Sequence, residues 1–145
     1  MRARAIWWLC VATTILVAGG ACGTDPAPSS QPSFGADPDQ TITTDSGNLT
    51  IEVRFSPSPP SIGTDASQLT FKDANGAALT GLSVGVVPWM PAHGHGTSVD
   101  PTVSETTPGT FVANPLYLFM PGSWELRVTI SGTVDDTAKA AFEIP

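Results

Sequence analysis

Two short stretches decide the fold: residues 49–55 read LTIEVRF and residues 124–130 read WELRVTI. In each stretch, large apolar residues alternate with polar or charged ones. An alternation with a period of two puts the two sets of side chains on opposite faces of an extended chain. Both stretches therefore predict β-strands with one buried face.

Weaker alternation of the same kind continues through the C-terminal part of the chain. It predicts further strands around residues 69–71, 82–86, 116–118 and 138–144. Turn residues separate them: DANG at 73–76 and Pro-Gly pairs at 108–109 and 121–122. No window carries a helical apolar stripe, so we expect residues 41–145 to form an all-β domain. The expected architecture is an immunoglobulin-like antiparallel β-sandwich of about seven strands.

The N-terminal end has the order of an export signal. Arg2 and Arg4 precede the apolar residues 5–18, and small residues follow directly. The apolar run is shorter than the ~20 residues of a membrane-spanning helix. We therefore expect residues 1–21 to be a cleaved signal peptide.

Residues 16–22, LVAGGAC, resemble the lipobox of bacterial lipoproteins, in which small residues precede a cysteine that is diacylated. Gly19 stands where that pattern usually has leucine. The resemblance implies that lipidated Cys22 anchors the chain to a membrane of the cell envelope, the outer membrane or cell surface in a bacterium with two membranes. Residues 22–40, rich in Pro, Ser, Gly and Asp, predict a flexible linker. The alternative is ordinary cleavage after Ala21, which gives a soluble secreted protein.

The charge of the chain limits its partners. Without the signal peptide, four basic residues remain against thirteen acidic ones, a net charge of 4 − 13 = −9. An acidic domain argues against binding to nucleic acid. Both cysteines, Cys10 and Cys22, precede the predicted domain, which therefore has no disulfide.

Soft metal ligands are concentrated in two segments. Apart from Met1, all methionines and histidines lie in residues 89–96 (WMPAHGHG) and 120–124 (MPGSW). If these two loops meet, they bring together two thioethers and two imidazoles, a set that suits Cu(I). The candidate metal ligands are Met90, His93, His95 and Met120, and copper is the candidate cofactor.

A second interpretation needs no metal. Methionine often fills gaps in a core, and Trp89 and Trp124 would pack over that core. The histidines would then be loop residues, and the domain would be structural or would bind an envelope protein.

A hydrolase is the third interpretation, because Ser98 and Asp100 lie near the histidines in the sequence. There is no nucleophile-elbow pattern and no glycine-rich oxyanion segment. We therefore expect no catalytic residues and no enzyme activity.

Residues 69–145 resemble the YtkA-like family of exported bacterial domains. Three segments carry the resemblance: MPAHGHGTS at 90–98, PTV at 101–103 and MPGSWEL at 120–126. It implies a compact immunoglobulin-like sandwich, often found on lipoproteins, with a poorly defined activity. Related FixH-like proteins accompany copper-transporting pumps and oxidase assembly, which associates the candidate ligands with metal handling.

Overall fold

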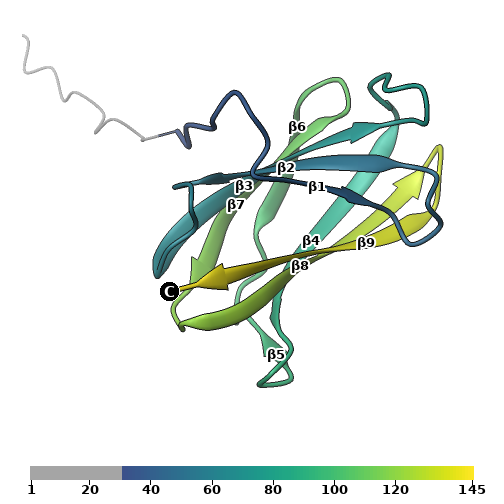
Figure 1. The fold of residues 1–145 in the computed structure, drawn as a ribbon. Coiled ribbons are helices and arrows are strands. Elements are labelled where there is room, and N and C mark those ends of the chain that lie inside the picture. The colour runs from purple at the N-terminus through teal and green to yellow at the C-terminus, as the bar shows by residue number, and fades with distance from the viewer. Residues whose placement is uncertain (1–30) are drawn as a thin grey trace, which may run out of the picture. The chain divides into compact units, whose positions relative to one another are not determined.

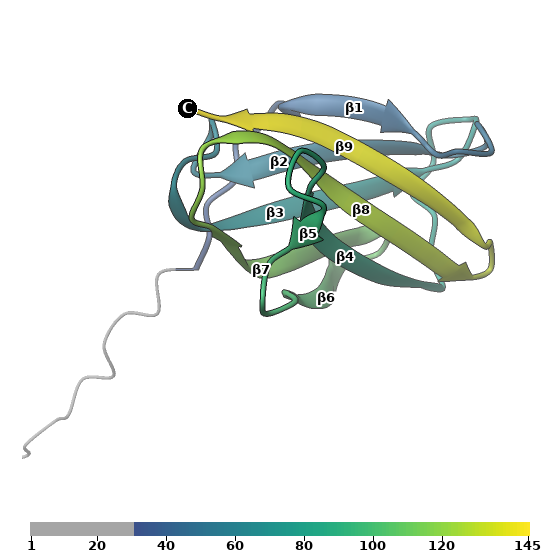
Figure 2. The same cartoon turned by 90° about the horizontal axis from the view of Figure 1, so that it is seen from below.

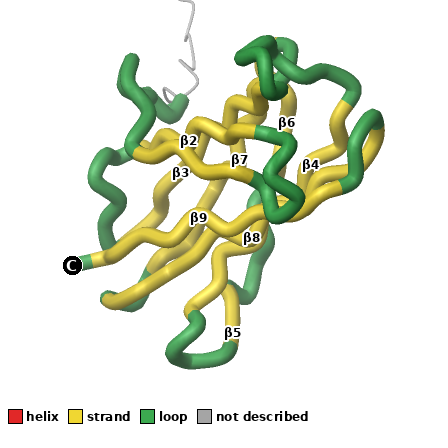
Figure 3. The backbone as a smooth tube through the Cα atoms, turned by 45° about the vertical axis from the view of Figure 1, so that its right-hand side comes forward, coloured by secondary structure: helices red, strands yellow, loops and turns green. Residues whose placement is uncertain are grey.

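A computed structural model describes residues 31–145, so the predicted signal peptide, Cys22 and the first part of the predicted linker lie outside the described residues. Within 31–145 there is no helix that could span a membrane. The chain forms nine strands there, and Figure 3 shows only strands and loops. They are β1 (Gln40–Thr43), β2 (Thr50–Ser56), β3 (Gly63–Lys72), β4 (Leu82–Met90), β5 (His95–Gly96), β6 (Thr102–Thr107), β7 (Thr110–Leu118), β8 (Gly122–Gly132) and β9 (Asp136–Ile144).

The strands form two antiparallel sheets that face each other (Figure 1). One sheet has the order β1-β2-β3-β7-β6 and the other the order β5-β4-β8-β9. The predicted all-β antiparallel sandwich is therefore confirmed. About seven strands were expected and nine are present; the six predicted stretches correspond to β2, β3, β4, β7, β8 and β9.

The core lies between the sheets and consists of the apolar residues that alternate in the sequence. In β2 and β8 the inward residues are at most 3% exposed: Ile51, Val53, Phe55, Trp124, Leu126, Val128 and Ile130. Burying one large apolar side chain contributes about 1.5–3 kcal/mol. A slip of one residue in either strand would move its whole apolar set to the solvent face, so the core fixes the register.

Three edge strands were not predicted from the sequence. β6 is exposed along most of its length, β1 has only four residues, and β5 has only two. β1 and β6 lie at the edges of the five-stranded sheet, and β5 lies at an edge of the four-stranded sheet. A strand with few core contacts has little apolar alternation, and the periodicity therefore does not reveal it.

The described end of the predicted linker is bound to β2. The N–H of Asp39 donates to the carbonyl of Val53 at 2.9 Å, and the N–H of Ser33 donates to the Ser56 hydroxyl at 3.2 Å. Arg54 donates to the carbonyl of Ala36 at 3.0 Å. Residues 33–39 therefore run antiparallel along β2, starting at its C-terminal end.

The loop after β1 is joined to the start of β9 by a hydrogen-bonded carboxylate. The Ser46 hydroxyl donates to Asp136, and this bond is the main reason that the pKa of Asp136 falls from 3.8 to about 2. A carboxyl with a lower pKa in the folded state stabilises the fold above its unfolded pKa. That stabilisation is lost as the pH falls through the folded value.

We expect Asp136→Asn to lower stability at pH 7, with a difference from wild type that shrinks between about pH 4 and about pH 2. Urea unfolding at a series of pH values measures this difference. Asp135→Asn is the matched control, because Asp135 is the exposed neighbour, whereas both the N–H and the hydroxyl of Ser46 donate to Asp136. A difference for Asp136→Asn that stays constant down to pH 2 would contradict the prediction.

Candidate functional site

The two segments with the candidate ligands meet at one end of the sandwich. β4 ends at Met90 and pairs antiparallel with β8, with Trp89 opposite Glu125. The end of β4 therefore lies beside the start of β8, and Met120 is in the turn just before β8. His95 and Met120 line the same groove, which has a volume of about 510 Å³.

A tight turn after β4 presents the two histidines. The N–H groups of His93 and Gly94 donate to the carbonyl of Met90 at 3.2 and 3.0 Å. Gly94 has a φ of 68°, a conformation that glycine adopts without strain. The chain then returns as β5, with His95 paired to Met90, and this hairpin projects beyond the rest of its sheet, downward in Figure 1 and toward the viewer in Figure 2.

The two imidazole rings are exposed and close together. Their centroids are 5.6 Å apart, and the planes are nearly perpendicular, at 81°. Nδ1 of His95 lies 3.0 Å from the carbonyl oxygen of Gly96. With the proton on Nδ1, this ring donates to the carbonyl, and Nε2 keeps a free lone pair. Histidine ligands of metals commonly have this arrangement.

The two methionines differ in their surroundings. Met90 is 2% exposed and belongs to the core, as the packing interpretation expects for a methionine. A Cβ on Gly122 would lie 3.1 Å from Cε of Met90, so the Met90 methyl group lies against the backbone of Gly122. Met120 is partly buried and lines the groove.

The two tryptophans also differ. Trp124 is 3% exposed and lies in the core, and its Nε1–H donates to the carbonyl of Met120 at 2.9 Å. Trp89 is not part of the core, in contrast to the expectation. Its ring lies under the guanidinium of Arg127, whose Cζ is 4.1 Å from the ring centroid. Of the two tryptophans, it is Trp124 that fixes the turn carrying Met120, because of its hydrogen bond to the Met120 carbonyl.

The rest of the groove is mainly apolar, and sequence reasoning did not predict these residues. Val99 and Phe119 are 55% and 62% exposed, and Phe119 stacks on Tyr117 with centroids 5.8 Å apart. Thr97 and Ser98 are the polar side chains beside His95. Val99 and Phe119 lie in loops, where alternation gives no signal. The concentration of aromatic residues within YLFMPGSW at 117–124 is the sequence feature that could have indicated this apolar lining.

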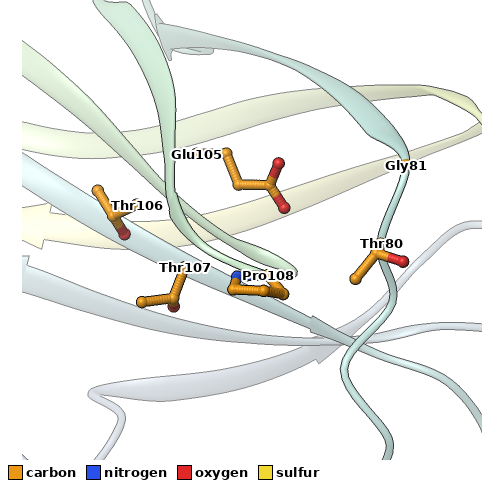
Figure 4. A pocket seen from close by; sticks show the side chains of 6 residues that line it. All are labelled: Thr80, Gly81, Glu105, Thr106, Thr107 and Pro108. Atoms are coloured by element: carbon orange, nitrogen blue, oxygen red, sulfur yellow. The ribbon is translucent and has the colours of Figure 1, made fainter.

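A second hollow lies at the other end of the sandwich and is a weaker candidate. It has a volume of about 350 Å³ and is lined by threonines, Gly81, Pro108 and Glu105 (Figure 4). The Glu105 carboxylate accepts the N–H of Gly109 at 2.8 Å, so it stabilises the β6–β7 turn. This second hollow offers few side chains that could bind a metal ion, and none of them is a soft ligand.

The donor types at the first groove favour a soft ion. Among residues 31–145, no group of three or more His, Cys, Asp or Glu side chains is placed to hold a metal ion. The imidazole of His95 and the thioether of Met120 line this groove, and the His93 ring lies beside that of His95. This set fits Cu(I) better than a hard cation such as calcium, which prefers oxygen ligands.

Comparison with known proteins identifies the domain. The sequence model of the family described as YtkA-like matches residues 43–129. The chain belongs to the YtkA-like family. The match begins in β1 and ends in β8, so it includes both segments of the candidate site and strands that precede residue 69. No curated protein and no solved structure matches the chain.

Proposed function

We propose that this YtkA-like protein is a lipoprotein of the bacterial envelope that binds Cu(I) through His93, His95 and Met120. The observation that supports the proposal best is that His95 and Met120, from different loops, line one groove. The His93 ring lies beside that of His95, 5.6 Å away between centroids. Met90 lies beneath this site, and its role is packing.

The chemistry of these donors suits an ion that must be exchanged outside the cytoplasm. A thioether and imidazoles are soft enough for Cu(I), and a thioether cannot be lost to disulfide formation. Because both histidines are exposed, the ion would stay accessible to a partner. The domain would therefore buffer or pass copper, without an enzymatic step.

The alternative is a structural or protein-binding domain that holds no metal. The observation in its favour is the apolar rim of the same groove, where Val99 and Phe119 are exposed. Copper binding by the soft donors separates the two proposals.

The test is a Cu(I) titration, with a competing chromophoric chelator, of the chain that begins at residue 23, which lacks the Cys22 thiol and therefore has no cysteine that could bind the ion. We expect one equivalent to bind, and His93→Ala/His95→Ala/Met120→Ala to lose about 100-fold or more in affinity.

Thr97→Ala/Ser98→Ala is the matched control, since these neighbours line the groove without soft donors. It should bind copper as wild type does. A wild-type chain that binds no Cu(I) would refute the metal proposal. A triple variant that also melts at a lower temperature would then favour the structural alternative.

A further inference from the structure

The exposed apolar side chains of the domain are concentrated at one end. Of the four large ones in residues 31–145, Ile62, Val99 and Phe119 are 54%, 55% and 62% exposed. Gly63 pairs with Leu118, so Ile62 and Phe119 are the next residues outward on neighbouring strands. Val99 and Phe119 line the same groove. An exposed apolar group of this kind commonly marks a contact surface.

The chain from Cys22 reaches the domain at this same end. Ser33 is hydrogen-bonded to Ser56, the last residue of β2, and the loop from Ser56 leads to Ile62. Ten residues, 23–32, separate Cys22 from Ser33. If they form the flexible linker that their composition predicts, their root-mean-square span is about 15–20 Å. A lipid on Cys22 would therefore keep this end of the domain near the membrane.

The charges around this end do not favour anionic lipid. Arg54 is paired with Glu52, and Arg127 is paired with Glu125. Lys72 lies at the opposite end of β3 from Gly63, and Lys139 lies within β9. No Lys or Arg side chain lines the groove. Attraction to anionic headgroups requires clustered Lys or Arg, whereas apolar and aromatic side chains enter the interface by the hydrophobic effect. A surface that is apolar and has no cluster of Lys or Arg is complementary to a zwitterionic lipid interface.

We propose that Ile62, Val99 and Phe119 form a membrane-docking surface that inserts into the zwitterionic interface of the membrane to which the chain is anchored. The proposal rests on the lipid attachment at Cys22 included in the proposed function. The anchor keeps the domain close, and the three side chains orient it. In this orientation the groove with His95 and Met120 lies near the lipid surface.

The test couples the domain to a membrane through its own cysteine. In the chain that begins at residue 22, Cys22 is the only thiol and reacts with a maleimide lipid in phosphatidylcholine vesicles. Trp89→Phe leaves Trp124, which lines the groove, as the only tryptophan. We expect brominated phosphatidylcholine to quench Trp124 fluorescence. Adding anionic lipid should not increase the quenching.

Ile62→Ser/Val99→Ser/Phe119→Ser in the same background should reduce the quenching about threefold or more. Val87→Ser is the matched control, because Val87 is the fourth exposed apolar residue and lies in β4. It should be quenched as strongly as its parent. Absence of quenching in the parent, or equal quenching in the triple variant, would overturn the docking proposal.

The coupling chemistry keeps this result independent of native lipidation and of copper. Lipidation is tested separately by fractionating cells that express Cys22→Ser, which should leave the membrane fraction. Copper binding is tested by titrating Ile62→Ser, which should bind Cu(I) as wild type does. Failure of the anchor or of copper binding is thereby distinguished from failure of docking.

Discussion

Trp124→Ala will lower the free energy of unfolding by about 3–5 kcal/mol. Trp124 is 3% exposed, and it lies opposite Phe142 of β9 at the end of the core. The truncation leaves a cavity and removes the Nε1–H that donates to the carbonyl of Met120. Urea unfolding of the chain that begins at residue 22 measures the loss.

Two controls separate the causes of this loss. Trp124→Phe keeps much of the buried volume but removes the donor, so it should cost less, about 1–2 kcal/mol. Ser123→Ala changes an exposed neighbour in β8 and should cost less than about 0.5 kcal/mol. A cost below about 1 kcal/mol for Trp124→Ala would mean that the core does not depend on this ring.

The strands that face the core could be predicted from the sequence because burial determines their residue pattern. Phe55 and Leu126 alternate with charged neighbours in the sequence, and both are buried in the structure. β6 could not be predicted in this way. Its side chains are mostly exposed at a sheet edge, so no alternation was required of them.

The difference between the two tryptophans could have been predicted from the parity of β4. Leu82, Val84 and Val86 alternate, and the same phase continues to Met90. An extension of the predicted strand to residue 90 would have put Met90 inward and Trp89 outward, as the structure has them. Pro88 keeps this phase, since it is buried and pairs with Leu126 of β8.

The candidate site was only partly predictable. The sequence indicated which residue types could bind a soft ion, because methionine and histidine, apart from Met1, occur in just two segments. That these segments meet follows from the pairing of β4 with β8, and local periodicity does not determine which distant strands pair. The exposure of Val99 and Phe119 likewise depends on tertiary contacts of loops.

Gly96→Ala will weaken Cu(I) binding by about 10–100-fold and change the melting temperature little. A Cβ at Gly96 would lie 2.6 Å from the carbonyl oxygen of Pro88, so β5 must move away from β4. His95 would move with it, because β5 consists of His95 and Gly96 alone and Nδ1 of His95 bonds the Gly96 carbonyl. The core would remain, since β5 is an edge strand. Chelator competition and thermal unfolding measure the two effects.

Gly85→Ala is the matched control for this change, because a Cβ there meets only the Thr129 side chain at 3.9 Å, an ordinary contact. It should leave both copper affinity and the position of β5 unchanged. The two glycines thus differ in whether a methyl group forces the histidine hairpin to move. If Gly96→Ala displaces β5, as measured by faster amide exchange at residues 95 and 96, and copper affinity stays at the wild-type value, then His95 does not bind the metal. The packing interpretation of this loop would then be the better one.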